Sequence, residues 1–127
     1  ISVAAVADYS PEHVSIQKIK KIEANLSLSL KKNKDILADV ASLPSPPFCV
    51  GFAAESENLL EYAEAKRKAK KLPLIVANLA SQAMGSDYNQ VTLLDDHGTY
   101  PLPQSKKHSI AQQILTHLSA MLANAAR

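Results

Sequence analysis

Short apolar runs separated by polar segments dominate the pattern along this chain. Ile1–Ala7, Phe48–Ala53 and Pro73–Ala77 are nearly unbroken apolar runs of the length of a strand. Such runs are typical of buried strands in a parallel sheet, because both faces of such a sheet are covered. The pattern therefore predicts three buried strands.

Two further segments have the pattern of more exposed strands. Leu26–Leu30 alternates strictly between leucine and serine, which predicts a strand with one face in water. Val91–Leu94 predicts another strand, and Asp95–Gly98 predicts a turn that leads to an edge strand around Tyr100. The polar and basic segment Tyr9–Asn25 has no periodicity and predicts a loop.

Three segments have the apolar spacing or the charge order of helices. Asn33–Leu43 has apolar residues at helical spacing behind a candidate N-cap, Asn33. Ser56 to about Lys71 begins with acidic residues and ends with lysines, which complements a helix dipole. Ser105 to about Asn124 is long and amphipathic. Helices alternating with strands predict an α/β fold with a mainly parallel sheet and helices on both faces.

Composition narrows the class of protein. The chain has 127 residues, 46% of them hydrophobic and 20% charged, which fits one globular domain and excludes a fibrous or disordered chain. Its single cysteine, Cys49, excludes an internal disulfide framework, and its apolar surroundings predict a buried structural thiol. No apolar run approaches the ~20 residues of a membrane span and no signal peptide opens the chain, so we expect a cytoplasmic protein.

The lysines gather in clusters although the net charge is only +2. One cluster lies within Lys18–Lys34 and another is the run K-R-K-A-K-K at Lys66–Lys71. Such clusters suit a polyanionic ligand, and the alternative is a set of solvated surfaces. Nucleic acid is disfavoured as that ligand, since the arginines are Arg67 and Arg127 alone and aromatic residues make up only 5% of the chain.

Polar side chains follow the predicted buried strands. Asp8 comes after the first, Phe52–Glu55 closes the second, and Asn78 comes after the third. Ligands bind beyond the carboxyl ends of strands in open α/β sheets, so these positions predict a site at one sheet edge. The alternative is that Asp8 and Asn78 cap turns. The three glycines do not form a dinucleotide fingerprint or a P-loop, because they lie far apart at Gly51, Gly85 and Gly98, and no H-E-x-x-H zinc motif is present.

Six short motifs occur in an order that resembles a known family. They are A-A-V-A-D-Y, K-I-K-K, N-x-D-I-L, V-G-F-A-A-E, E-Y-A-x-x-K-R-x-x-K and L-I-V-A-N, which begin at Ala4, Lys18, Asn33, Val50, Glu61 and Leu74. The chain resembles the phosphopantothenate–cysteine ligases of coenzyme A biosynthesis over almost its whole length.

The resemblance implies a Rossmann-like α/β fold in which residues 1–127 are the C-terminal part of a larger ligase domain. It implies that CTP, with Mg²⁺, activates the carboxylate of 4′-phosphopantothenate as an acyl-cytidylate, which the amine of L-cysteine then attacks. It also implies a homodimer, without FMN in this chain and without nucleic-acid or membrane partners.

The resemblance assigns roles to individual positions. Lys18 corresponds to the lysine needed to form the acyl-cytidylate, Asp8 is a weak candidate for the metal, and Asn78 is a weak candidate on the pantothenate side. Asn33 would cap its helix and turn free N–H groups toward phosphate. The nucleotide contacts fall on Ser2, Val3, Ala4, Asp8, Lys18, Lys34, Asp35, Ile36, Leu37, Phe52, Lys66 and Lys70.

Some positions depart from the family pattern. Lys34 stands where the family usually has proline, Leu79 where it has aspartate, and the segment Gln82–Asn89 is short. The glycine-rich phosphate-binding segment and the asparagine that the family has in an N-terminal half are not in this sequence. An alternative reading is therefore a nucleotide-binding fragment of that enzyme without turnover of its own.

Overall fold

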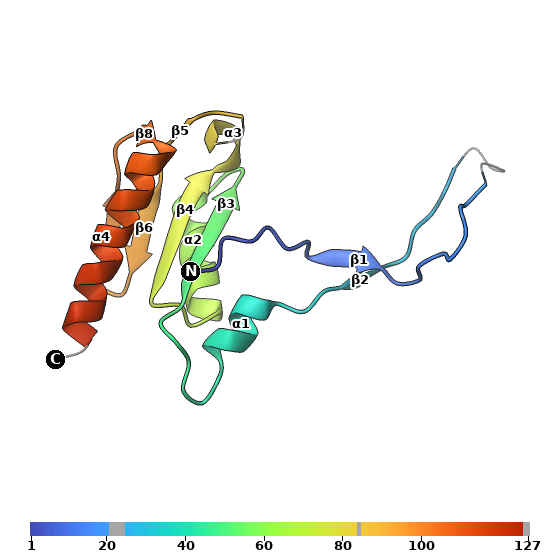
Figure 1. The fold of residues 1–127 in the computed structure, drawn as a ribbon, viewed down its shortest axis with the longest axis horizontal. Helices are drawn as coiled ribbons and strands as arrows, with labels where there is room; N and C mark the ends of the chain where they lie inside the picture. The colour runs from blue at the N-terminus through green and yellow to red at the C-terminus, as the bar shows by residue number, and fades with distance from the viewer. Residues whose placement is uncertain (21–24, 84, 126–127) are drawn as a thin grey trace. The chain divides into compact units, whose positions relative to one another are not determined.

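The computed structural model describes residues 1–20, 25–83 and 85–125 (Figure 1). The chain divides into two compact units. The larger unit combines Ile1–Val3 with Leu37–Arg127, and the smaller unit is Ala4–Ile36.

A four-stranded sheet forms the centre of the larger unit. Its strands lie in the order β3 (Val50–Glu55), β4 (Leu74–Leu79), β6 (Thr92–Asp95) and β7 (Thr99–Pro101). β3 and β4 are parallel, whereas β4, β6 and β7 pair antiparallel, so the sheet is mixed. The predicted strands in these four segments are confirmed. A second small sheet pairs β5 (Tyr88–Asn89) with β8 (Ser105–Lys106).

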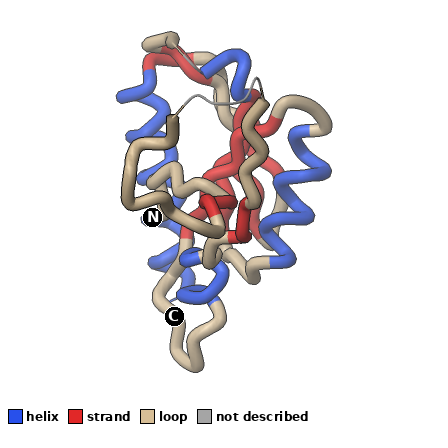
Figure 2. The backbone as a smooth tube through the Cα atoms, turned by 90° about the vertical axis from the view of Figure 1, so that its right-hand side faces the viewer, coloured by secondary structure: helices blue, strands red, loops and turns tan. Residues whose placement is uncertain are grey.

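Helices cover both faces of the central sheet, as Figure 2 shows. α1 (Ile36–Ala41) and α2 (Leu59–Ala69) supply the first core cluster, in which Ala63 of α2 and Ile75 of β4 are buried. α4 (Lys107–Ala125) supplies the second cluster on the opposite face, with Ile110 and Ile114 buried against the strands. α3 (Ala80–Ala83) is a single turn after β4. The predicted α/β class with helices on both faces is confirmed, whereas the described central sheet has one parallel and two antiparallel pairings in place of the mainly parallel sheet predicted.

Two predicted helices begin later than the sequence suggests. α2 begins at Leu59, and its N-cap is Asn58 in a left-handed conformation (φ 46°) rather than Ser56. α1 begins at Ile36, because the side chain of Asn33 has other partners. Its Nδ2 donates to the Ala7 carbonyl at 2.8 Å, and its Oδ1 accepts from the Ser10 hydroxyl at 2.7 Å. The predicted Asn33 cap is therefore wrong.

The first apolar run does not form the buried strand that the pattern predicts. Residues 1–7 are irregular and exposed, and Val3 is 71% exposed. The Ser2 N–H does donate to the Val50 carbonyl at 2.9 Å, where β3 begins. An apolar run becomes a buried strand only where other elements cover it, and the described residues do not cover this one.

The smaller unit contains a two-stranded antiparallel ribbon. β1 (Tyr9–Pro11) pairs with β2 (Leu30–Lys32), and Tyr9 lies opposite Lys32. The predicted strand at residues 26–30 therefore contributes only its last residue, and Leu28 is 59% exposed. The predicted loop at residues 9–25 contains β1 and is otherwise irregular over its described part. Residues 21–24, which include Lys21 of the K-I-K-K motif, lie outside the described residues.

Candidate functional site

The carboxyl ends of β3 and β4 lie side by side. Their parallel register puts Ala54 opposite Asn78 and Glu55 opposite Leu79. The sequence-based prediction that the end of the second apolar run and Asn78 share one sheet edge is therefore confirmed. Asn78 lies inside β4 and not after it, and it is partly buried.

An ion pair joins this edge to α2. The Oε1 of Glu55, the last residue of β3, lies 2.7 Å from the Nζ of Lys66. The Glu55 side chain is only 11% exposed, whereas that of Lys66 is 51% exposed. The ammonium of Lys66 thus contacts a buried carboxylate, while about half of the Lys66 side chain is exposed to water.

Lys70 lies beyond the last residue of α2, at its C-cap. Its backbone N–H donates to the Lys66 carbonyl at 3.0 Å, which places the two lysines one helical turn apart, as their spacing predicts. α2 runs antiparallel to β3, since β3 and β4 are parallel neighbours. Lys70 is therefore one turn farther than Lys66 from the carboxyl end of β3.

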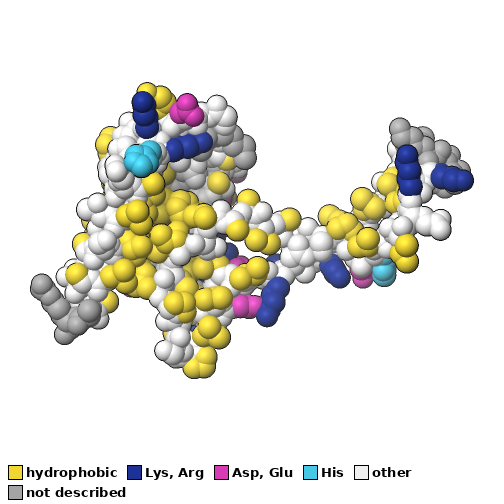
Figure 3. All heavy atoms as spheres, viewed as in Figure 1, with side chains coloured by type: hydrophobic (Ala, Val, Ile, Leu, Met, Phe, Trp, Pro, Cys, Tyr) yellow, Lys and Arg dark blue, Asp and Glu magenta, His cyan; other side chains and the backbone are white. Residues whose placement is uncertain are grey.

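Phe52 lies on the other face of the sheet. Side chains alternate along a strand, so Phe52 shares the face of Val50, which belongs to the core cluster beneath α4. Glu55 shares the face of Ala53, which belongs to the cluster beneath α2. Phe52 is 44% exposed, and Figure 3 shows apolar side chains gathered over this part of the larger unit, beside α4.

The other predicted nucleotide contacts are divided between the two units. Ser2 and Val3 open the larger unit, and Leu37 packs partly buried against its first core cluster. Six residues belong to the smaller unit, where all are exposed: Ala4, Asp8, Lys18, Lys34, Asp35 and Ile36.

Within the smaller unit, Asp8 comes close to the segment that begins at Asn33. The Asn33 N–H donates to the Asp8 carbonyl at 2.8 Å, which continues the alignment of β1 with β2. Asp8 and Lys34 thus flank the same end of the ribbon. Lys18 lies in the irregular segment after β1.

A second charge cluster, around Arg67, ties α2 to the turn between β6 and β7. The guanidinium donates to both carboxylate oxygens of Glu64 at 2.7 and 3.0 Å, to Asp96 at 2.7 Å and to the Leu72 carbonyl at 3.2 Å. These hydrogen bonds and the adjacent Lys68 lower the pKa of Glu64 to about 2. The guanidinium is almost completely buried, and its hydrogen bonds to carboxylates raise its pKa above the usual range.

An open cleft of about 680 Å³ lies beside the Arg67 cluster, between α2 and the β6–β7 turn. Asp95 pairs with Leu74, the first residue of β4, so this cleft lies at the opposite end of β4 from Glu55. Arg67 makes four hydrogen bonds to protein oxygens there. This cluster was not predicted from the sequence, although the i,i+3 spacing of Glu64 and Arg67 on one helix is a usable signal.

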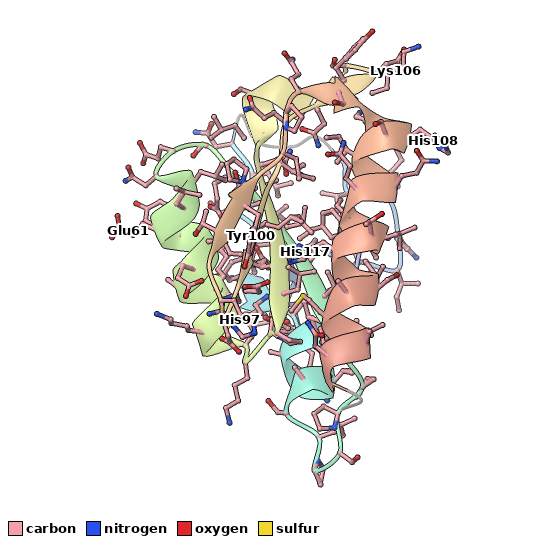
Figure 4. The ribbon with its side chains drawn as sticks, turned by 90° about the vertical axis from the view of Figure 1, so that its left-hand side faces the viewer. Glu61, His97, Tyr100, Lys106, His108 and His117 are labelled. Carbon is pink, nitrogen blue, oxygen red and sulfur yellow. The ribbon has the colours of Figure 1, made fainter. Side chains whose placement is uncertain are left out.

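A buried carboxylate also fixes α4 to the sheet. Asp95 Oδ2 lies 2.9 Å from His117 Nε2, and its Oδ1 accepts the backbone N–H groups of His97 and Gly98. Burial favours the protonated form, but these hydrogen bonds outweigh it, so the pKa of Asp95 lies below its ordinary value. The His117 and Tyr100 rings lie 4.8 Å apart between α4 and the strands (Figure 4).

No helix in the described ranges is long and apolar enough to cross a membrane.

Known proteins are similar in sequence to most of this chain. A family model described as the DNA/pantothenate metabolism flavoprotein C-terminal domain matches residues 1–122. The coenzyme A biosynthesis bifunctional protein CoaBC of Vibrio cholerae serotype O1 is 42% identical over 121 residues, which are 91% of this chain and 30% of that protein. The protein of the same name from Escherichia coli K12 is 42% identical over 125 residues, 93% of this chain and 31% of that protein.

Solved structures have the same fold. The crystal structure of the C-terminal domain of a coenzyme A biosynthesis bifunctional protein CoaBC matches with a TM-score of 0.73 and 32% identity, over 95% of this chain and 53% of that one. A DNA/pantothenate metabolism flavoprotein from Streptococcus pneumoniae matches with a TM-score of 0.72 at 20% identity, over 92% of this chain and 60% of that one. The chain thus spans about a third of the curated relatives and about half of the first solved domain.

Proposed function

Because the chain belongs to the family of the DNA/pantothenate metabolism flavoprotein C-terminal domain, we propose that it is part of the ligase of coenzyme A biosynthesis. The reaction is the CTP-dependent joining of 4′-phosphopantothenate to L-cysteine, in the cytoplasm. One observation carries the nucleotide part of the proposal: Lys66, half-exposed, is held by a buried carboxylate at the carboxyl end of β3. That edge is where open α/β sheets bind ligands.

The proposed reaction has two steps. A carboxylate oxygen of 4′-phosphopantothenate attacks the α-phosphorus of CTP, which forms the acyl-cytidylate and releases pyrophosphate. The amine of cysteine then attacks the acyl carbon, an amide bond forms, the bond to CMP breaks, and the amine loses a proton. A carboxylate needs this activation because its own oxygen is a poor leaving group, and two phosphate-bearing substrates need cations that hold them side by side.

The exposure of several side chains supports their proposed roles. We assign Lys18 to the charge that develops at the reacting phosphate, and its exposed position on an irregular segment leaves it accessible. Phe52 would pack against the base or ribose, and it is 44% exposed. Lys66 and Lys70 would contact phosphates. Asn78 would serve the pantothenate side, and the backbone contacts would come from Ser2, Val3, Ala4, Lys34, Asp35, Ile36 and Leu37.

The donor set fits a magnesium ion that arrives with the nucleotide. Among the residues that the structure describes, no three side chains of histidine, cysteine, aspartate or glutamate form a metal cage. Mg²⁺ commonly uses one or two carboxylates together with substrate phosphates and water, and the exposed carboxylate of Asp8 suits that role. When bound, the ion would neutralise charge on the triphosphate.

The oligomeric state is part of the proposal. We propose a homodimer, on the family resemblance alone. FMN, nucleic acid and membranes have no part in the proposed reaction.

Calorimetric titration with CTP and separately with ATP, both with Mg²⁺, tests the nucleotide side. We expect saturable binding with CTP preferred, followed by pyrophosphate release when 4′-phosphopantothenate is added before any cysteine. Lys66→Ala combined with Lys70→Ala should raise the Kd for CTP at least about tenfold, since each ammonium makes a charge-assisted contact. Lys68→Ala is the matched control, because Lys68 pairs with Glu64 on the same helix.

Two results would count against the proposal in different ways. Unchanged CTP affinity in the double variant would refute the assignment of Lys66 and Lys70. CTP binding without pyrophosphate release would favour the second candidate, a nucleotide-binding fragment without turnover.

A further inference from the structure

The pairing of Glu55 with Lys66 follows from the way the two elements cross. Glu55 ends β3 on the face that α2 covers, as the alternation from Gly51 through Ala53 requires. Lys66 lies on the side of α2 that faces this strand end, and its four-carbon stem brings Nζ within 2.7 Å of Oε1. The two residues are 11 positions apart in sequence, so the contact depends on the packing of α2 on β3.

The two ends of this ion pair differ in their surroundings. The Glu55 carboxylate is nearly buried, and a carboxylate in that position needs a cationic or hydrogen-bonding partner. Lys66 has three N–H donors, of which one meets Glu55 Oε1. Its half-exposed ammonium therefore keeps donors accessible from the solvent side.

The neighbouring basic residues of α2 lack this combination. Lys68 is 71% exposed and pairs at 3.3 Å with Glu64, whose carboxylate is shared with Arg67. Arg67 is buried and bound to protein oxygens. Lys66 alone among these three is both anchored by a buried group and open to a ligand.

We propose that Glu55 is a positioning residue that holds the ammonium of Lys66 where it meets a phosphate of the bound nucleotide. This inference rests on the proposed nucleotide binding. A free lysine side chain must lose the freedom of its long stem when it binds a phosphate, and Glu55 removes much of that freedom in advance. The remaining Lys66 donors then bridge from Glu55 to phosphate oxygens.

The test compares the affinity of the chain and its variants for CTP with Mg²⁺ and for cytidine. Glu55→Gln keeps the shape and an acceptor oxygen but loses the charge. We expect it to raise the Kd for CTP about two- to fivefold, and to leave the Kd for cytidine unchanged because cytidine lacks phosphate. Glu55→Asp keeps the charge but shortens the reach, and it should also weaken CTP binding. Glu57→Gln removes a charge two residues away on an exposed position and is the matched control.

A double-mutant cycle separates positioning from a purely structural role. In a Lys66→Met background, Glu55→Gln should cause no further change in the Kd for CTP, because the group that it positions is gone. An additive effect in that background would overturn the inference, and so would CTP affinity in Glu55→Gln and Glu55→Asp equal to that of the parent chain. The proposed function would survive either result. Failure of the parent chain to bind CTP would instead reject both. If Glu55→Gln fails to fold, the same cycle with Glu55→Asp decides.

Discussion

The carboxylate of Glu64 offers a test of how α2 is held in place. It forms a two-pronged contact with the buried guanidinium of Arg67, at 2.7 and 3.0 Å, and a longer one with Lys68. Glu64→Gln keeps the size of the side chain and removes its charge. Arg67 would keep Asp96 as its remaining ionic partner.

The loss of stability expected for Glu64→Gln can be worked out from the pKa of Glu64. The hydrogen bonds from Arg67 lower this pKa from 4.5 to about 2. That difference corresponds to at most about 3.4 kcal/mol of stability at neutral pH. The Glu64 side chain is 31% exposed, and water screens the pair. We therefore expect Glu64→Gln to lower the free energy of unfolding by about 1–2 kcal/mol at pH 7.

The pH dependence gives the sharper assay. The pKa is lowered in the folded state, so the carboxylate stabilises the fold fully above about pH 4.5 and loses that effect as the pH falls toward 2. Urea unfolding of the parent chain and of Glu64→Gln should therefore differ most at pH 7, with less than half of the difference left at pH 3. Glu61→Gln, an exposed charge on the same helix, is the control. A difference that is equal at both pH values, or no larger than in the control, would refute the reasoning.

Three further predictions concern the core and the α4 contact. Gly51→Ala places a Cβ 2.7 Å from the buried Leu72 side chain and should lower the free energy of unfolding in urea by about 1–3 kcal/mol; a neutral effect would mean that Leu72 repacks freely. Asp95→Asn should lower the free energy of unfolding in urea by about 1–3 kcal/mol at pH 7. That loss of stability should shrink as the pH falls through the lowered pKa of Asp95, whereas a pH-independent loss would mean that the charge of the Asp95 carboxylate does not stabilise the fold. Cys49 is buried and should react with a thiol reagent at least about a hundredfold more slowly in the folded chain than in urea; fast native reaction would contradict its burial.

The apolar runs predicted the central sheet well where helices cover it. Phe48–Ala53 and Pro73–Ala77 became β3 and β4 because α2 and α4 bury their two faces. Ile1–Ala7 is also largely apolar, yet it is exposed. Hydrophobic patterning reports that a segment favours burial, and it carries no information on which element provides the cover.

Side-chain partners were harder to predict than strands. Asn33 has the sequence position of a helix cap, yet its amide bonds to Ala7 and Ser10 across the ribbon of the smaller unit. The meeting of Ala54 with Asn78 followed from the rule for parallel strand ends. The sequence offered no comparable rule for Glu55 and Lys66, because their contact depends on which side of α2 faces the end of β3.

The basic run on α2 shows why charge clusters in a sequence overstate a shared role. Successive residues of a helix point about 100° apart, so adjacent cations face different surroundings. Lys66 faces the strand end and Glu55, Arg67 faces inward to the β6–β7 turn, and Lys68 faces outward to Glu64. A polyanion that approaches residues 66–68 would therefore meet one anchored, half-exposed lysine side chain and a second lysine that is already paired with a carboxylate. Arg67, between these two lysines in sequence, links α2 to the β6–β7 turn through Asp96. Its removal should therefore destabilise the chain, whereas the removal of Lys66 should weaken ligand binding.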